Sequence, residues 1–236
     1  ILSISIPITI SSIISVVSSV IDTATVSNCI QFAYRDAGMA KDALEELAMK
    51  MTGILSKIDT LITFPIAINM AFSTALVPAV SESIATKDYK TAASRMSFSL
   101  FASILIIVPC AAGFIALADP ILRMIYPAAS DGALILQISS ISMILIALSQ
   151  TITGGLYGID KQKIPAIALT IGVTIKFILN LILVSNPNIN IAGASISSVV
   201  CQLMVFIIGF KVLYNNLKMK MSFNKYVFKP ILSAVI

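Results

Sequence analysis

The sequence has no histidine, and only 11% of its 236 residues are charged. Without histidine it lacks the commonest general base and the commonest zinc ligand, which excludes most hydrolases and metalloenzymes. An average soluble domain is about 25% charged, and a water-soluble chain of this length would need more polar residues to cover its surface. We therefore expect neither a soluble protein nor an enzyme, and no cofactor.

Cysteine is also scarce. Cys29, Cys110 and Cys201 lie far apart and form no C-x-x-C pair, which predicts buried thiols and neither a disulfide nor a metal site. Three glycines occur between residues 154 and 158, but no lysine and hydroxyl residue follow them as in a phosphate-binding loop. At the end of a membrane helix, such glycines predict a close approach to another helix.

Apolar residues make up most of the chain: 58% is hydrophobic, and the mean hydropathy is +0.98. Only helices or closed barrels can span a bilayer, because its core offers no water to unpaired backbone groups. The long apolar runs here lack the alternation of barrel strands, so we predict an all-α integral membrane bundle. A span needs about 20 apolar residues, which places six helices at residues 3–26, 52–79, 98–118, 133–154, 165–185 and 191–213, and the start of a seventh at 227.

The six-helix bundle accounts for residues 1–213, and residues 214–236 are expected to form a basic cytoplasmic loop and the start of a further membrane helix. Both ends lie in apolar sequence without charged flanks, which suggests an internal fragment. The first apolar stretch has neither the basic region nor the cleavage site of a signal peptide. The mixed-charge connection 27–51 is expected to carry a short surface helix.

Basic residues predict the orientation, because they are retained on the cytoplasmic side of a membrane. The odd-numbered loops hold 4 of them and the even-numbered loops hold 10. The first group is Arg35, Lys41, Lys50 and Arg123, and the second is Lys87, Lys90, Arg95, Lys161, Lys163, Lys211, Lys218, Lys220, Lys225 and Lys229. We therefore predict a multi-pass protein of the cell membrane with its even-numbered loops in the cytoplasm. These loops would face anionic membrane lipids, so the formal charge of +5 does not indicate nucleic acid.

Polar residues recur on one face of the first predicted span. Ser11, Ser15, Ser18, Asp22 and Thr25 follow steps of three and four residues, which places them in one row along a helix. Such a row either lines a hydrated cavity or packs closely against a neighbouring helix. The carboxylate of Asp22 favours a cavity or an ion site.

The second predicted span has a similar polar face that includes Asp59, and it also contains Lys57 and Pro65. Lys57 and Asp59 are two residues apart, so they do not lie on the same side of a helix. Lys57 is near the end of the span, where its side chain either reaches the headgroups or contributes to an ion pathway. Pro65 removes a backbone hydrogen bond and predicts a kink.

Lys176 is the most costly residue within the predicted spans. A lysine near the middle of a membrane helix costs about 2.5–3.5 kcal/mol on insertion scales, so its side chain requires a partner in protein or water. Asn180 follows one turn later, and Asp22 is the best placed acid. We therefore predict an ion pair between Asp22 and Lys176, which is either a structural clamp or a switch in a transport cycle.

Several short motifs are spread over the chain. They are Phe64-Pro65, Leu-Val-Pro-Ala-Val-Ser-Glu at 76–82, Leu-Ala-Asp-Pro-Ile-Leu at 117–122, Gly-Leu-Tyr-Gly at 155–158, Lys176 with Asn-Leu-Ile-Leu at 180–183, and Ile-Ala-Gly-Ala at 191–194. As a set they resemble the multidrug/oligosaccharidyl-lipid/polysaccharide exporter superfamily. Within it, the branch of stage V sporulation protein B and the lipid II flippases is the most similar.

The resemblance implies a fold of about 14 helices, with two lobes of six that are related by pseudo-symmetry and two extra helices in the flippases. This chain would be helices seven to the start of thirteen, the second lobe, and the missing N-terminal lobe of the same protein would be its partner. It also implies transport of a lipid-linked saccharide across the cytoplasmic membrane for cell-wall or spore-cortex synthesis. Transport would proceed by alternating access through a cavity between the lobes.

The resemblance further implies a sodium site built from an acid on helix seven, polar groups on helix eleven and a hydroxyl on helix twelve. The matching positions here are Asp22, Lys176, Asn180, and Ser197 or Ser198. A lysine ammonium at this place would substitute for the cation, so we expect no bound metal.

Asp59 matches the acid of an Asp-Arg pair on helix eight in the same family. Thr60 stands in place of the arginine, so the cation that pyrophosphate recognition requires would have to come from Lys57.

Three functions are compatible with these features. The leading one is a flippase or exporter of a lipid-linked oligosaccharide or polysaccharide precursor. A multidrug cation antiporter of the same superfamily is the nearest alternative, and a non-transporting membrane partner in wall synthesis belongs to a different class. A cationic cavity favours the first, whose substrates are pyrophosphate anions, and an anionic cavity favours the second.

Overall fold

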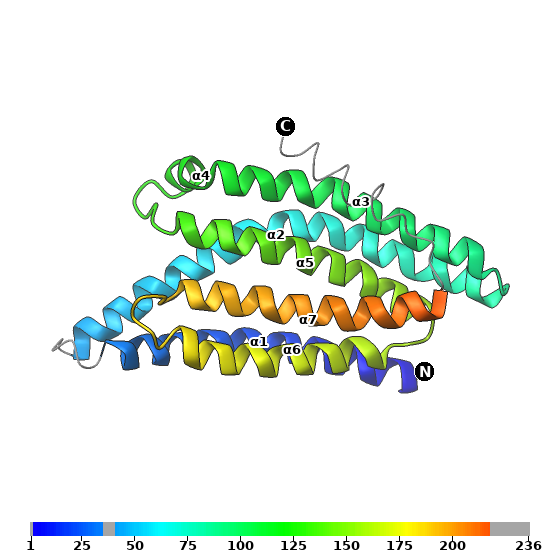
Figure 1. The fold of residues 1–236 in the computed structure, drawn as a ribbon, viewed down its shortest axis with the longest axis horizontal. Helices are drawn as coiled ribbons and strands as arrows, with labels where there is room; N and C mark the ends of the chain where they lie inside the picture. The colour runs from blue at the N-terminus through cyan, green and yellow to red at the C-terminus, as the bar shows by residue number, and fades with distance from the viewer. Residues whose placement is uncertain (1, 35–40, 218–236) are drawn as a thin grey trace.

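The computed structural model describes residues 2–34 and 41–217, and the regular structure within these residues is entirely α-helical. The helices are α1 (Leu2–Ala33), α2 (Lys41–Ala85), α3 (Tyr89–Ala116), α4 (Ala118–Ile125), α5 (Ala133–Gly158), α6 (Lys163–Leu183) and α7 (Ala192–Leu217). The long helices run side by side in an elongated bundle (Figure 1).

Within the described residues, six helices are long and apolar enough to cross a membrane, and only α4 is too short. This confirms the predicted fold class of an all-α membrane bundle. The seventh span that is expected to begin at residue 227, and the basic loop before it from residue 218 onward, lie outside the described residues.

α2 is 45 residues long, and its extent corrects the prediction of a separate surface helix in the first connection. Residues 41–51 are the first turns of α2, where Leu44 and Ala48 lie one turn apart and are buried. This stretch contains no proline or glycine, so nothing in it interrupts the helical hydrogen bonds. Further along, Pro65 and Pro78 lie inside α2. Figure 1 shows α2 bending along its length, as a proline causes.

The short helix α4 is absent from the predictions, and a proline accounts for it. Pro120 lies in the first turn of α4, where its missing N–H leaves no hydrogen bond unmade. Its ring would clash with the carbonyl of Ala116, four residues earlier, and α3 ends at that residue. The chain therefore leaves one helix and starts another within two residues.

α5 is the central helix and packs against α2, α3 and α7. A Cβ on Gly154 would lie 2.7 Å from the Ser73 carbonyl oxygen of α2, and one on Gly158 would lie 2.8 Å from Val80. The Ser73 hydroxyl also donates a hydrogen bond to the Gln150 carbonyl oxygen at 2.6 Å. The close helix approach predicted from the glycines is therefore confirmed where α5 crosses α2.

α1 lies at one side of the bundle, where it packs against α6 and also contacts α2 (Figure 1). Its Val16, Val17 and Val20 are exposed, which is expected where lipid or another part of a membrane protein covers a helix. Because α1 lies alongside α6, polar residues of the two helices face each other inside the spanning region.

Candidate functional site

An ion pair joins α1 to α6 within the spanning helices. The Lys176 ammonium of α6 contacts Oδ2 of Asp22 on α1, as the sequence predicts. The side chains are 14% and 29% exposed respectively, so both are largely removed from solvent. Two isolated charges there would each be costly, and the pairing offsets part of that cost.

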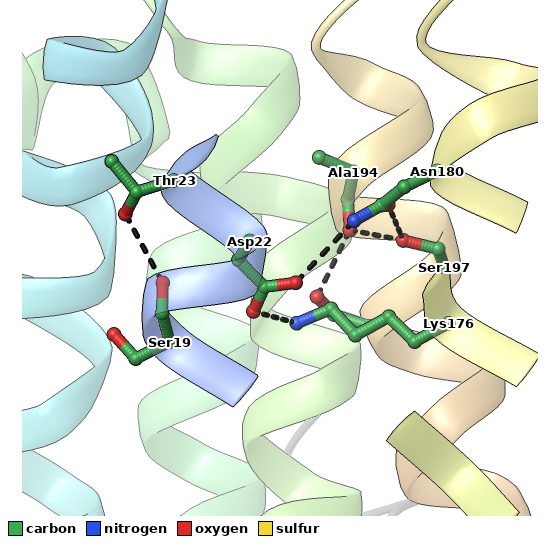
Figure 2. A network of polar contacts seen from close by, with 8 residues as sticks. Ser19, Asp22, Thr23, Lys176, Asn180, Ala194 and Ser197 are labelled. Carbon is green, nitrogen blue, oxygen red and sulfur yellow. Dashed lines mark hydrogen bonds and ion pairs between the residues drawn. The ribbon is translucent and has the colours of Figure 1, made fainter. Parts of the chain in front are cut away.

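Asn180 and Ser197 extend the ion pair into a network that reaches α7 (Figure 2). Asn180 Nδ2 donates to Oδ1 of Asp22 at 3.3 Å, and the Asn180 Oδ1 accepts from the Ser197 hydroxyl. Asn180 and Ser197 are fully buried. Each carboxylate oxygen of Asp22 therefore accepts a hydrogen bond from α6, and α7 holds the amide in the required orientation.

Ser197, rather than Ser198, is the hydroxyl that contacts Asn180. The Ser198 hydroxyl donates to the Ala194 carbonyl oxygen at 2.9 Å. That carbonyl also lies 2.9 Å from the Ser197 hydroxyl, which has a single proton to donate. The sequence left these two serines as alternatives, and the structure distinguishes them.

A cavity of about 420 Å³ lies beside the network, between α1, α2, α5, α6 and α7. Most of its lining residues carry hydroxyls, and three carry charges. The lining is Ser15, Ser18, Ser19, Asp22, Thr23, Val26, Thr52, Leu55, Ser56, Asp59, Ser139, Ser142, Lys176, Ala194, Ser195 and Ser198. The polar row predicted on the first span lines this cavity through Ser15, Ser18 and Asp22, whereas Ser11 and Thr25 do not.

Asp59 of α2 also lines the cavity and interacts electrostatically with both Asp22 and Lys176. Its side chain makes no hydrogen bond or ion pair within residues 2–34 and 41–217. The cavity thus has two carboxylates and one ammonium in its wall. With all three ionised, its charge is negative by one.

Lys57 does not line this cavity. Its ammonium donates to the Ala129 carbonyl oxygen and lies 5.7 Å from the centre of the Tyr126 ring. Both partners belong to the connection between α4 and α5, which lies at one end of the bundle. Lys57 therefore holds this connection against α2, and its part in an ion or substrate pathway stays a prediction.

The cavity also contains serines that were not predicted from the sequence. Ser139 and Ser142 of α5 line it together with Ser195 of α7. The Ser139 and Ser195 hydroxyls lie 3.3 Å apart. Both helices carry serines three residues apart, at 139 and 142 and at 195 and 198, and this spacing was the available signal.

A charged network beside a polar cavity, inside spanning helices, is typical of membrane transporters. A sequence model of the family described as lipid II flippase MurJ matches residues 6–236, and the chain belongs to this family. The superfamily indicated by the motifs is thereby confirmed.

Two curated proteins of Bacillus subtilis (strain 168) are similar to the chain. Lipid II flippase MurJ is 26% identical over 199 residues, which are 81% of this chain and 36% of that protein. Uncharacterized membrane protein YabM is 29% identical over 157 residues, which are 66% of this chain and 29% of that protein. The chain thus spans about a third of the length of the curated relatives it matches. No solved structure matches it significantly.

Proposed function

We propose that the chain is the second lobe of a flippase that moves a lipid-linked saccharide precursor across the cell membrane. The observation that carries this proposal is an ion pair between Asp22 and Lys176 beside a polar cavity, in a chain of the lipid II flippase MurJ family. The chain spans only 36% of the Bacillus subtilis flippase, so the other lobe is proposed to come from the same protein.

The proposed mechanism is alternating access, in which two lobes move against each other around a central path. Such a movement needs an element with two discrete arrangements. α1 fits this role because it lies at the side of the bundle and its ion pair is with α6. We propose that the network between α1 and α6 forms in one state of the cycle and opens in the other.

Lys176 supports a mechanism without a bound sodium ion. Its ammonium contacts Asp22, whose second oxygen accepts from Asn180. A sodium ion would compete for the same carboxylate, and a covalently attached cation is always present there.

The charge of the cavity also favours a second candidate function. When Asp22 and Asp59 are both ionised, they outnumber the single ammonium of Lys176, and a negative cavity attracts cations. A multidrug cation antiporter is therefore the second candidate. In a flippase, the positive charge that a pyrophosphate group requires would have to come from the other lobe.

The proposed orientation places the α2–α3 and α5–α6 connections in the cytoplasm. It rests on the excess of basic residues in the even-numbered loops. The exposed valines of α1 would then face lipid or the first lobe.

The test is to express the complete protein in a strain depleted of its own lipid II flippase. We expect growth with the wild type and loss of growth with Lys176→Ala and Asp22→Ala. Thr174→Ala is the matched control on α6, because the Thr174 hydroxyl donates to the Thr170 carbonyl oxygen of its own helix, at 2.8 Å. It should rescue growth as the wild type does.

The outcomes of this growth test distinguish the flippase from the cation antiporter. Rescue by the wild type and by all the variants would reduce the ion pair to a structural clamp. A wild-type protein that inserts stably and does not rescue would exclude lipid II as the substrate. Export of cationic drugs would then be measured in the same strain.

A further inference from the structure

The short helix α4 lies where a spanning helix ends. α3 has 28 residues, which rise by about 42 Å, and a bilayer with its headgroup regions is about 40–45 Å thick. α4 starts two residues after α3, at the end of the bundle where α1 ends and α7 begins (Figure 1). α4 is therefore placed at the depth of the lipid headgroups. It contributes no residue to the ion pair or to the lining of the cavity beside it.

The side chains of α4 form three rows, and two of them have partners within the protein. Ala118 and Leu122 lie one turn apart and are buried in the core of the bundle. Asp119 and Arg123, also one turn apart, form an ion pair at 2.8 Å, and both side chains are exposed. One row therefore holds α4 against the bundle, and a second row presents charges to water.

The third row is apolar and uncovered. It consists of Leu117, Pro120, Ile121 and Met124, whose spacing places them along one side of the helix. Leu117 is 53% exposed and Met124 is 77% exposed, although contact of such side chains with water is unfavourable. A helix with an apolar row and a charged row on different sides is typical of helices that lie in the membrane interface.

Lipid fits the apolar row better than a protein partner does. The row continues the apolar surface of α3, where Phe98 and Leu105 are exposed. α3 is the most apolar of the six candidate spans in the described residues, with a mean hydropathy of 2.4. A stable protein interface buries about 800 Å² on each partner, which is more than one row on a two-turn helix offers.

The charges of α4 show which part of a lipid would hold it. Asp119 and Arg123 are the only charged residues between 118 and 125, and they neutralise each other. Attraction to anionic headgroups would therefore contribute little. Apolar contact with the acyl chains remains as the stabilising interaction.

We propose that α4 is an interfacial anchor. Its apolar row inserts among the acyl chains just beneath the headgroups, and its ion pair stays in water. α4 packs against α3 and α5, so it fixes the depth of these two helices in the membrane. The inference goes beyond the proposed function, because it does not depend on which molecule the protein moves.

The test measures where each row lies in a membrane. The complete protein, with its other cysteines replaced, carries a polarity-sensitive fluorophore on Met124→Cys and is reconstituted in phosphatidylcholine vesicles. Bromine atoms on the acyl chains near the headgroup quench a label in the lipid, and iodide on both sides of the membrane quenches a label in water. We expect bromolipid to quench the label at position 124 and iodide to leave it unchanged.

Arg123→Cys is the matched control, because it is adjacent in sequence and belongs to the charged row. Its label should be quenched by iodide and not by bromolipid. Leu117→Cys lies on the same apolar row as Met124 and should give the same result, which keeps the test valid if one variant folds poorly.

Two results would overturn the proposal. Quenching of both rows by iodide would place the apolar row in water. Protection of the labels at 117 and 124 from both quenchers would mean that protein covers the row, whether the first lobe, a second copy or another protein. Replacement of phosphatidylcholine by anionic phosphatidylglycerol should leave the pattern unchanged, and insertion only in the anionic lipid would contradict an anchor held by apolar contact.

Discussion

Replacement of Lys176 by methionine should destabilise the complete protein. Methionine keeps a side chain of similar length and removes the ammonium. Asp22 would retain the hydrogen bond from Asn180 at 3.3 Å and lose its ion pair. The Asp59 carboxylate, which interacts electrostatically with Asp22 and Lys176, would then repel Asp22 without a compensating cation.

The magnitude follows from the burial of the pair. An exposed pair contributes about 0–1 kcal/mol, and removal of one partner from a fully buried pair costs about 3–5 kcal/mol. Lys176 is 14% exposed and Asp22 is 29% exposed, so the pair lies between these limits. We expect Lys176→Met to lower the free energy of unfolding by roughly 1–3 kcal/mol.

The assay is reversible unfolding of the complete protein in bicelles for the two single variants, Lys176→Met and Asp22→Asn, and the double variant. The double variant should be more stable than the sum of the single effects predicts, by about 1–2 kcal/mol, because both partners are then neutral. Strict additivity would show that the pair contributes no interaction energy. Lys57→Met is the control, and it should cost only about 1 kcal/mol, the value of a single hydrogen bond.

Three further predictions concern the response of the ion pair to sodium, the packing of α2 and the start of α3. The thermal stability of the wild-type protein should be the same in sodium chloride as in choline chloride. That of Lys176→Ala should be higher in sodium chloride, because the Asp22 carboxylate then lacks a cation. Equal responses of the two proteins would contradict the proposed role of the lysine. Gly154→Ala should lower the free energy of unfolding by about 1–3 kcal/mol, because its Cβ would lie 2.7 Å from a carbonyl oxygen of α2. Gly53→Ala, with open space around its Cβ, should instead stabilise α2 by about 0.5–1 kcal/mol. Denaturant titration of both variants measures these changes. Hydrogen bonds from Thr91 to Asp88 at the start of α3 lower the pKa of the Asp88 carboxyl. The ionised carboxylate therefore stabilises the start of α3 fully above its unfolded pKa of about 3.9, and this stabilisation is lost as the pH falls through the folded value. Hydrogen exchange at the start of α3 should show this loss in the wild type and not in Asp88→Asn.

The sequence predicted the ion pair because an unpaired charge inside a membrane is costly. A lysine in the middle of an apolar span needs a partner, and Asp22 was the best placed acid. Asn180 followed from its position one turn after Lys176. These predictions depended on the cost of an isolated charge in a membrane and on the position of each residue along its span, and the sequence gives both.

The cavity-lining serines of α5 could not be predicted in the same way. A serine in a membrane helix can face a cavity, another helix or its own backbone, and the sequence does not distinguish these. Ser139 and Ser142 line the cavity because packing against α2, α3 and α7 fixes the rotation of α5. Lys57 illustrates the same limit, since its partner Ala129 is 72 residues away in a connection whose path the sequence does not specify.

The hydrogen bonds between Asp22 of α1 and helix α6 are all donated by α6 and accepted by α1. Ser197 lies against Asn180, and Asn180 and Lys176 both donate to Asp22, so the α6 donors converge on one carboxylate of α1. If α1 moved away from α6, both donors would lose their acceptor in the same step, and the buried amide would have no replacement. Intermediate separations would therefore be the least stable, and α1 would occupy two distinct positions instead of a continuous range.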